Sequence, residues 1–125
     1  GSARSEGIYT PPSVQGTVMI PGNAGGSNWG GIAWDAGRQV AIANVMHFPF
    51  VVALIPRDDF DTVRESGLYP DTEFSPQQGT PYGMRRKPLL SSWDMPCIAP
   101  PWSTLAAVDM AAGRILWQVP LGGTQ

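Results

Sequence analysis

Short runs of apolar residues, separated by turn-forming residues, dominate the hydrophobic pattern along this chain. Runs of this length, rich in β-branched and aromatic side chains, predict β-strands rather than helices. The run at residues 50–55 is continuously apolar and lies between Pro49 and Pro56, which is typical of a strand covered on both faces. Strands are therefore predicted at residues 17–20, 31–34, 39–45, 50–55, 82–87, 103–109 and 114–119.

One segment departs from the strand pattern and predicts a helix of two or three turns, at residues 57–67. Asp58 or Asp59 is suited to cap its N-terminus, and Gly67 is suited to end it. The following residues 68–82 contain several prolines and no sustained apolar run, which indicates a long exposed loop. The chain is therefore predicted to be all-β, with one short helix next to a long loop.

The composition supports a single domain with many tight turns. Of the 125 residues, 42% are hydrophobic and 14% are charged, and 15 are glycine and 13 are proline. A net charge of −2 without a basic block excludes nucleic acid as a partner. No apolar run reaches the roughly 18 residues that span a bilayer. Gly1 and Ser2 are typical of a cloning remnant, so the domain is predicted to cover residues 3–125.

Residue types that usually carry catalysis are scarce. The chain has one histidine, His47, and one cysteine, Cys97. A nucleophile needs a base beside it, and His47 is the only histidine available, so a small hydrolase is disfavoured. His47 has no metal-ligating neighbour at ligand spacing, and Cys97 beside a proline is typical of a buried small residue. The acidic cluster at residues 58–61 fits a solvated helix start, so no catalytic residue and no metal ligand is assigned.

The most distinctive stretch is a glycine-rich loop at residues 25–31, with the sequence GGSNWGG. Glycines allow the backbone to approach a flat group closely, while Asn28 offers two donors and an acceptor. Trp29 adds a large apolar surface with one N–H. The loop is therefore predicted to present a polar group to a planar ligand. The alternative is a β-turn in which Asn28 caps the turn and Trp29 packs in the core.

Two segments of the chain resemble each other, at residues 33–38 and 107–114. Both place an aspartate, Asp35 or Asp109, before a tight glycine turn that is followed by an arginine and a strand. Their offset of 109 − 35 = 74 residues exceeds the about 40–50 residues of one propeller blade. An offset of this size would be explained by one blade that contains a long insertion. Such units cannot bury both faces alone, which indicates a larger sheet assembly or self-association through open edges as a homo-oligomer.

The second of these segments carries a recognisable motif. Residues 107–117 read A-x-D-x-x-A-G-x-x-x-W, which resembles the tryptophan-docking motif of the quinoprotein dehydrogenases. These enzymes are eight-bladed β-propellers that carry pyrroloquinoline quinone (PQQ). Ala112 stands where threonine or serine is usual in that motif. Further stretches are similar to the membrane-bound glucose dehydrogenase branch, which includes quinate/shikimate dehydrogenases: residues 9–13, 21–23, 29–31, 79–83, 96–97 and 100–102.

The resemblance implies an all-β fold of antiparallel sheets that form about two blades of the propeller, from the C-terminal half of a longer enzyme. That enzyme would be anchored to the inner membrane, face the periplasm, oxidise a sugar or polyol hydroxyl and pass electrons to ubiquinone. Its cofactor would be PQQ with Ca²⁺ or Mg²⁺. Asn28 and Trp29 would contact the cofactor.

The family's catalytic aspartate and metal ligands are not assigned to residues of this chain, and they are expected upstream, on other blades. The isolated chain is therefore expected to have no turnover and at most weak cofactor binding. A second interpretation from a different class is a non-catalytic β-sheet module that associates through its open edges.

Overall fold

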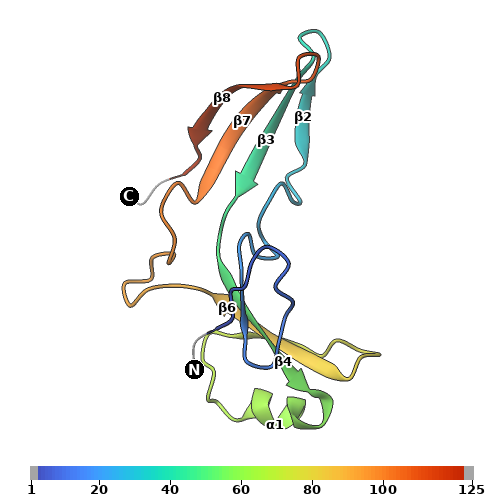
Figure 1. Cartoon of the computed structure of the whole chain (residues 1–125), viewed down its shortest axis with the longest axis vertical. Coiled ribbons are helices and arrows are strands. Elements are labelled where there is room, and N and C mark those ends of the chain that lie inside the picture. Colours follow the sequence, from blue (N-terminus) through green and yellow to red (C-terminus); the bar gives the residue numbers. More distant parts are fainter. Residues whose placement is uncertain (1–2, 123–125) are drawn as a thin grey trace. The chain divides into compact units, whose positions relative to one another are not determined.

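The computed structural model describes residues 3–122 and divides into two compact units, each built on a four-stranded antiparallel sheet (Figure 1). One unit holds the residues up to Met19 and Phe50–Leu89, and the other holds Ile20–Pro49 and the residues from Leu90 onward. Gly1 and Ser2, the expected cloning remnant, lie outside the described residues.

The first sheet has the strand order β1-β4-β6-β5, with β1 (Thr17–Met19), β4 (Phe50–Pro56), β6 (Tyr82–Pro88) and β5 (Glu73–Ser75). The second has the order β2-β3-β7-β8, with β2 (Ile32–Asp35), β3 (Val40–Met46), β7 (Ser103–Asp109) and β8 (Arg114–Pro120). The predicted antiparallel sheets are confirmed, and each has the four strands of one propeller blade.

The two similar segments around Asp35 and Asp109 lie in one sheet, so their interpretation as repeats of a whole blade is wrong. Asp35 ends β2 and Asp109 ends β7, and a hairpin turn follows each of them. The backbone N–H of Met110 donates to the carbonyl oxygen of Gln39 at 2.9 Å, which joins the two turns. Strands β4, β5 and β6 of the first unit are inserted between β3 and β7, and this insertion separates the two hairpins in sequence.

Each of these turns is closed by its aspartate. Asp35 accepts hydrogen bonds from the backbone N–H of Arg38 at 3.0 Å and from its guanidinium at 2.8 Å. Asp109 accepts from the backbone N–H groups of Ala111 and Ala112 at 3.0 and 2.9 Å. The turn before β8 is therefore closed even though Ala112 replaces the usual hydroxyl residue.

Protonation of Asp35 provides a test of the first turn. The side-chain hydrogen bond from Arg38, followed by its backbone N–H, holds the pKa of the Asp35 carboxyl below its ordinary value of about 3.9. Because the folded-state pKa is the lower one, the carboxylate stabilises the turn above about pH 4. That contribution is lost as the pH falls through the folded-state pKa. We expect an NMR titration of Asp35 to show a lowered midpoint, which Arg38→Gln raises. A midpoint that Arg38→Gln leaves unchanged would contradict this account.

The prediction of a continuous loop at residues 68–82 is wrong, because its middle forms β5 at the edge of the first sheet. Glu73 of β5 is the register partner of Arg86 in β6. The two side chains form a paired contact, with nitrogen–oxygen distances of 2.6 and 2.7 Å. The hydrophobic pattern shows no strand here, because β5 has only three residues and its pairing partners in β6 are distant in sequence.

The predicted helix is present but short. A 3₁₀ turn, η1 (Arg57–Asp59), leads into α1 (Phe60–Glu65), which ends two residues before Gly67. Asp59 stands at the N-cap position without a side-chain hydrogen bond, so the expected aspartate capping contact is absent from this helix. Arg57 instead ties the helix start to the next loop, by donating to the carbonyl oxygens of Gln77 at 2.8 Å and Thr80 at 3.0 Å.

The second sheet leaves its edge strand β8 uncovered. Every residue of β8 is exposed, including the apolar Ile115, Leu116, Trp117 and Val119. An exposed apolar edge strand calls for a further protein surface to cover it. No helix within residues 3–122 is long and apolar enough to cross a membrane.

Candidate functional site

The glycine-rich loop of residues 25–31 is attached to the end of β3 by two backbone hydrogen bonds. The N–H of Gly26 donates to the carbonyl oxygen of Met46 at 2.8 Å, and the N–H of Met46 donates back to Gly26 at 3.1 Å. At Gly25, a Cβ atom would lie 2.1 Å from the Cβ of Pro21. Only glycine fits at that position, so the loop can lie close against the strand because it lacks side chains.

Asn28 is oriented by the loop itself. Its side-chain Nδ2 donates to the backbone carbonyl oxygen of Asn23 at 3.0 Å. The backbone carbonyl oxygen of Asn28 accepts from the backbone N–H of Gly31 at 3.0 Å. The Asn23 carbonyl oxygen can only accept, so the side-chain amide nitrogen of Asn28 must face it. This leaves the Oδ1 of Asn28 and one of its two side-chain N–H groups for another partner. The Asn28 side chain thus holds the loop to Asn23, as the turn-capping alternative expects, and it keeps binding capacity for a further group.

The Trp29 side chain is almost fully exposed to solvent. Its side chain is 99% exposed, so the alternative in which Trp29 packs in the core is wrong for the described residues. An indole in this setting presents a flat apolar surface and a free edge N–H. Such a surface suits stacking on a planar group.

The loop and the end of β3 together line a pocket of about 330 Å³. Asn28 and Trp29 line it from the loop, and Asn44 and Met46 line it from β3. The missing side chain of Gly30 opens part of this space, because a Cβ there would lie 3.4 Å from Oδ1 of Asn44. Sequence reasoning missed Asn44 and Met46. The available signal was that Asn44 is the one polar residue in the apolar run of residues 40–46.

The chemistry of this pocket is uncharged. Its lining includes asparagine amides, an indole and a thioether, and it contains no acidic or basic side chain. His47 and Cys97 are not part of it, and Cys97 is exposed rather than buried as predicted. Within residues 3–122, no three His, Cys, Asp or Glu side chains gather to hold a metal ion. This chain can therefore contribute hydrogen bonds and stacking at the pocket.

Comparison with known proteins identifies the family. Residues 1–125 match the PQQ family "Glucose/ethanol/alcohol dehydrogenase, beta-propeller domain". The chain is 42% identical to the quinoprotein glucose dehydrogenase of Escherichia coli (strain K12), over 98% of this chain. It is 34% identical to the quinate/shikimate dehydrogenase (quinone) of Acinetobacter baylyi, over 99% of this chain. It is 36% identical to the glycerol dehydrogenase large subunit of Gluconobacter oxydans, over 96% of this chain.

The chain spans only a small part of these relatives. It covers 16% of the glucose and quinate/shikimate dehydrogenases and 18% of the glycerol dehydrogenase subunit. No solved structure matches the chain. The resemblance recognised in the motif that ends at Trp117 is confirmed by the family match, and two four-stranded antiparallel sheets agree with a partial propeller. The chain therefore belongs to the PQQ family of glucose/ethanol/alcohol dehydrogenase β-propeller domains.

Proposed function

We propose that this chain is part of a PQQ-dependent dehydrogenase that oxidises a hydroxyl group of a sugar or polyol. The observation that carries the proposal is the family match along all 125 residues. The relatives are named for glucose, quinate or shikimate, and glycerol, which are all polyhydroxylated compounds. The name of the quinate/shikimate enzyme also specifies a quinone, which supports a quinone as electron acceptor.

The pocket beside the glycine-rich loop fits one edge and one face of the cofactor ring. The free Oδ1 of Asn28 and the amide of Asn44 would hydrogen-bond its polar edge, and Trp29 would pack against its plane. PQQ carries carboxylate groups, and this uncharged lining leaves their cationic partners to other parts of the enzyme. When bound, PQQ with Ca²⁺ or Mg²⁺ would supply the acceptor for the hydride of the hydroxyl-bearing carbon.

The longer enzyme would be anchored to the inner membrane, face the periplasm and transfer electrons to ubiquinone. The base and the metal ligands would lie on other blades, so the isolated chain is expected to show no turnover. Sequencing the gene on both sides of this chain tests the placement. A longer reading frame with further tryptophan-ended repeats supports it, and an isolated short frame overturns it.

Trp29 provides a direct optical test of the pocket. We expect PQQ with Ca²⁺ to quench the tryptophan emission of the chain weakly, and Trp29→Phe to remove most of this quenching, since the exposed indole is the one at the pocket. The matched control is Trp93→Phe, because Trp93 is also highly exposed and does not line this pocket. Equal loss of quenching in the two variants would contradict the assignment of Trp29.

Asn28 is tested by affinity in the full-length enzyme. Asn28→Ala removes one hydrogen bond to the cofactor, and such a bond contributes about 1 kcal/mol. We expect the cofactor dissociation constant to rise about 3- to 10-fold, measured from the quinone absorbance during titration of the apoenzyme. The variant also loses the contact with Asn23, so circular dichroism must first show an unchanged fold. An unchanged dissociation constant in a folded variant would remove Asn28 from the site.

A second candidate function is favoured by the exposed edge strand β8. Its uncovered apolar residues would allow the isolated chain to associate edge to edge without any chemistry. Sedimentation at increasing concentrations tests this candidate. A rise in mass with concentration supports association through open edges, and a monomer over a wide range counts against it.

A further inference from the structure

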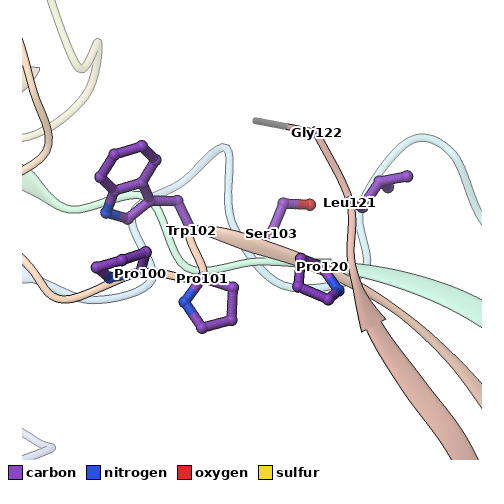
Figure 2. A pocket seen from close by; sticks show the side chains of 7 residues that line it. All are labelled: Pro100, Pro101, Trp102, Ser103, Pro120, Leu121 and Gly122. Carbon is purple, nitrogen blue, oxygen red and sulfur yellow. The ribbon is translucent and has the colours of Figure 1, made fainter. Parts of the chain in front are cut away.

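A second pocket, of about 600 Å³, lies where β7 begins and β8 ends (Figure 2). Its walls are proline rings, the Trp102 indole and the Leu121 side chain. Figure 2 shows the Ser103 hydroxyl directed into the space between Trp102 on one side and Pro120 and Leu121 on the other. The volume is typical of small-molecule sites, and so is an apolar wall with one well-placed polar group.

Hydrogen bonds hold the walls of this second pocket in place. The indole N–H of Trp102 donates to the carbonyl oxygen of Ile98 at 3.0 Å, and the backbone N–H of His47 donates to the carbonyl oxygen of Trp102 at 2.8 Å. The N–H of Leu121 donates to the carbonyl oxygen of Ser103 at 2.9 Å. Among residues 3–122 the Ser103 hydroxyl has no such partner, so it is available to a ligand.

The second pocket is a neighbour of the one beside the glycine-rich loop. Met46 of β3 lines the first pocket and is the register partner of Ser103 of β7, which lines the second. Paired residues of antiparallel strands carry their side chains on the same face, with Cα atoms about 4.5–5.5 Å apart. Lining residues of the two pockets therefore meet across a single strand spacing.

We propose that this second pocket binds the quinone that accepts electrons from the cofactor. The inference rests on the proposed function, which supplies both the cofactor in the first pocket and a quinone as acceptor. An uncharged wall of prolines, indole and leucine suits a neutral planar ring with an apolar tail. The Ser103 hydroxyl would donate a hydrogen bond to one ring carbonyl oxygen.

The reaction at this site is a balanced exchange between two quinones. The acceptor takes up two electrons and two protons, and its two carbonyl oxygens become hydroxyls. PQQ, when bound in its reduced form, would supply these two electrons and two protons. Electron transfer slows steeply with distance, so two pockets that meet across one strand spacing favour it.

Photolabelling of the full-length dehydrogenase tests where the quinone binds. An azido derivative of short-chain ubiquinone is expected to label the peptide that contains residues 100–103 or 120–122, and excess ubiquinone-1 should suppress this label. Labelling of other peptides alone would overturn the inference. No labelling would also overturn it, because that result is expected when another part of the protein or a second copy covers this pocket.

Variants separate quinone binding from the rest of catalysis. Leu121→Trp fills the pocket and should raise the KM for ubiquinone-1 at least about 10-fold, while activity with the soluble dye phenazine methosulfate stays unchanged. Ser103→Ala should raise that KM about 3- to 10-fold, and Ser103→Thr, which keeps the hydroxyl, should restore it. The control is Leu68→Trp, at an exposed leucine of the other unit.

Measuring activity with the dye and with ubiquinone-1 as alternative acceptors tests the second pocket separately from the proposed function. If the unmodified enzyme oxidises no polyol with the dye as acceptor, the proposed function itself is wrong. If dye-linked activity is present and Leu121→Trp leaves the KM for ubiquinone-1 unchanged, only the second pocket is wrongly assigned. A loss of both activities in Leu121→Trp that Leu68→Trp does not show would likewise overturn the assignment of this pocket to the acceptor.

Discussion

Phe60→Ala is expected to lower the free energy of unfolding of the first unit by about 3–5 kcal/mol. The ring of Phe60 is 3% exposed and packs edge to face on Phe74, with centroids 6.3 Å apart and planes at 72°. The guanidinium carbons of Arg57 and Arg64 lie 6.0 and 5.7 Å from the ring centroid. Alanine would leave a cavity and remove these cation–π contacts together.

The change is best measured by amide hydrogen exchange in β4 and β6, because this reports on the first unit alone. The matched control is Leu68→Ala, which also shortens an apolar side chain but at a position that is 74% exposed. It should change the free energy by no more than about 0.5 kcal/mol. If Phe60→Ala cost no more than Leu68→Ala, Phe60 would not be the packing centre of this unit.

Gly25→Ala is expected to displace the glycine-rich loop and to abolish the pocket that the loop lines. The new methyl group would lie 2.1 Å from the Cβ of Pro21 and 3.0 Å from the carbonyl oxygen of Met46, so the backbone must move. Overpacking of this kind costs about 1–3 kcal/mol. We expect amide exchange at Gly26 and Met46 to accelerate about 10- to 100-fold, with loss of PQQ quenching.

Gly37→Ala is the control for this substitution. Neither Gly25 nor Gly37 has the positive φ that disfavours a side chain, so the two variants are compared by the space that a new Cβ would find. A Cβ at Gly37 would meet only Oδ1 of Asp35, at an ordinary contact distance of 3.5 Å. Similar exchange rates in the two variants would show that the close approach at Gly25 does not position the loop.

Half of the first pocket was visible in the sequence. The glycines around Asn28 and Trp29 predicted a loop that presents an amide and an indole, and both residues line the pocket. Asn44 and Met46 could not be connected to that loop, because they enter the pocket from another strand. Two backbone hydrogen bonds between Gly26 and Met46 bring the loop and the strand together. Every residue other than proline carries the same backbone groups, so the sequence does not indicate which of them will pair.

The sequence by itself determined the local elements and the family. The hairpin turns at Asp35 and Asp109 depend on residues only a few positions apart, so a short window contains the interactions that form them. The motif that ends at Trp117 likewise lies in one segment and was enough to suggest the quinoprotein dehydrogenases.

Only the tertiary structure decided which strands share a sheet. The pairing of β3 with β7 joins strands that β4, β5 and β6 separate in sequence, and β5 pairs with β6 where Glu73 meets Arg86. The pairing of Met46 with Ser103, which makes the two pockets neighbours, belongs to the same long-range register. Such pairings are stabilised by the sum of many weak contacts between distant residues, and no local stretch of sequence contains both partners.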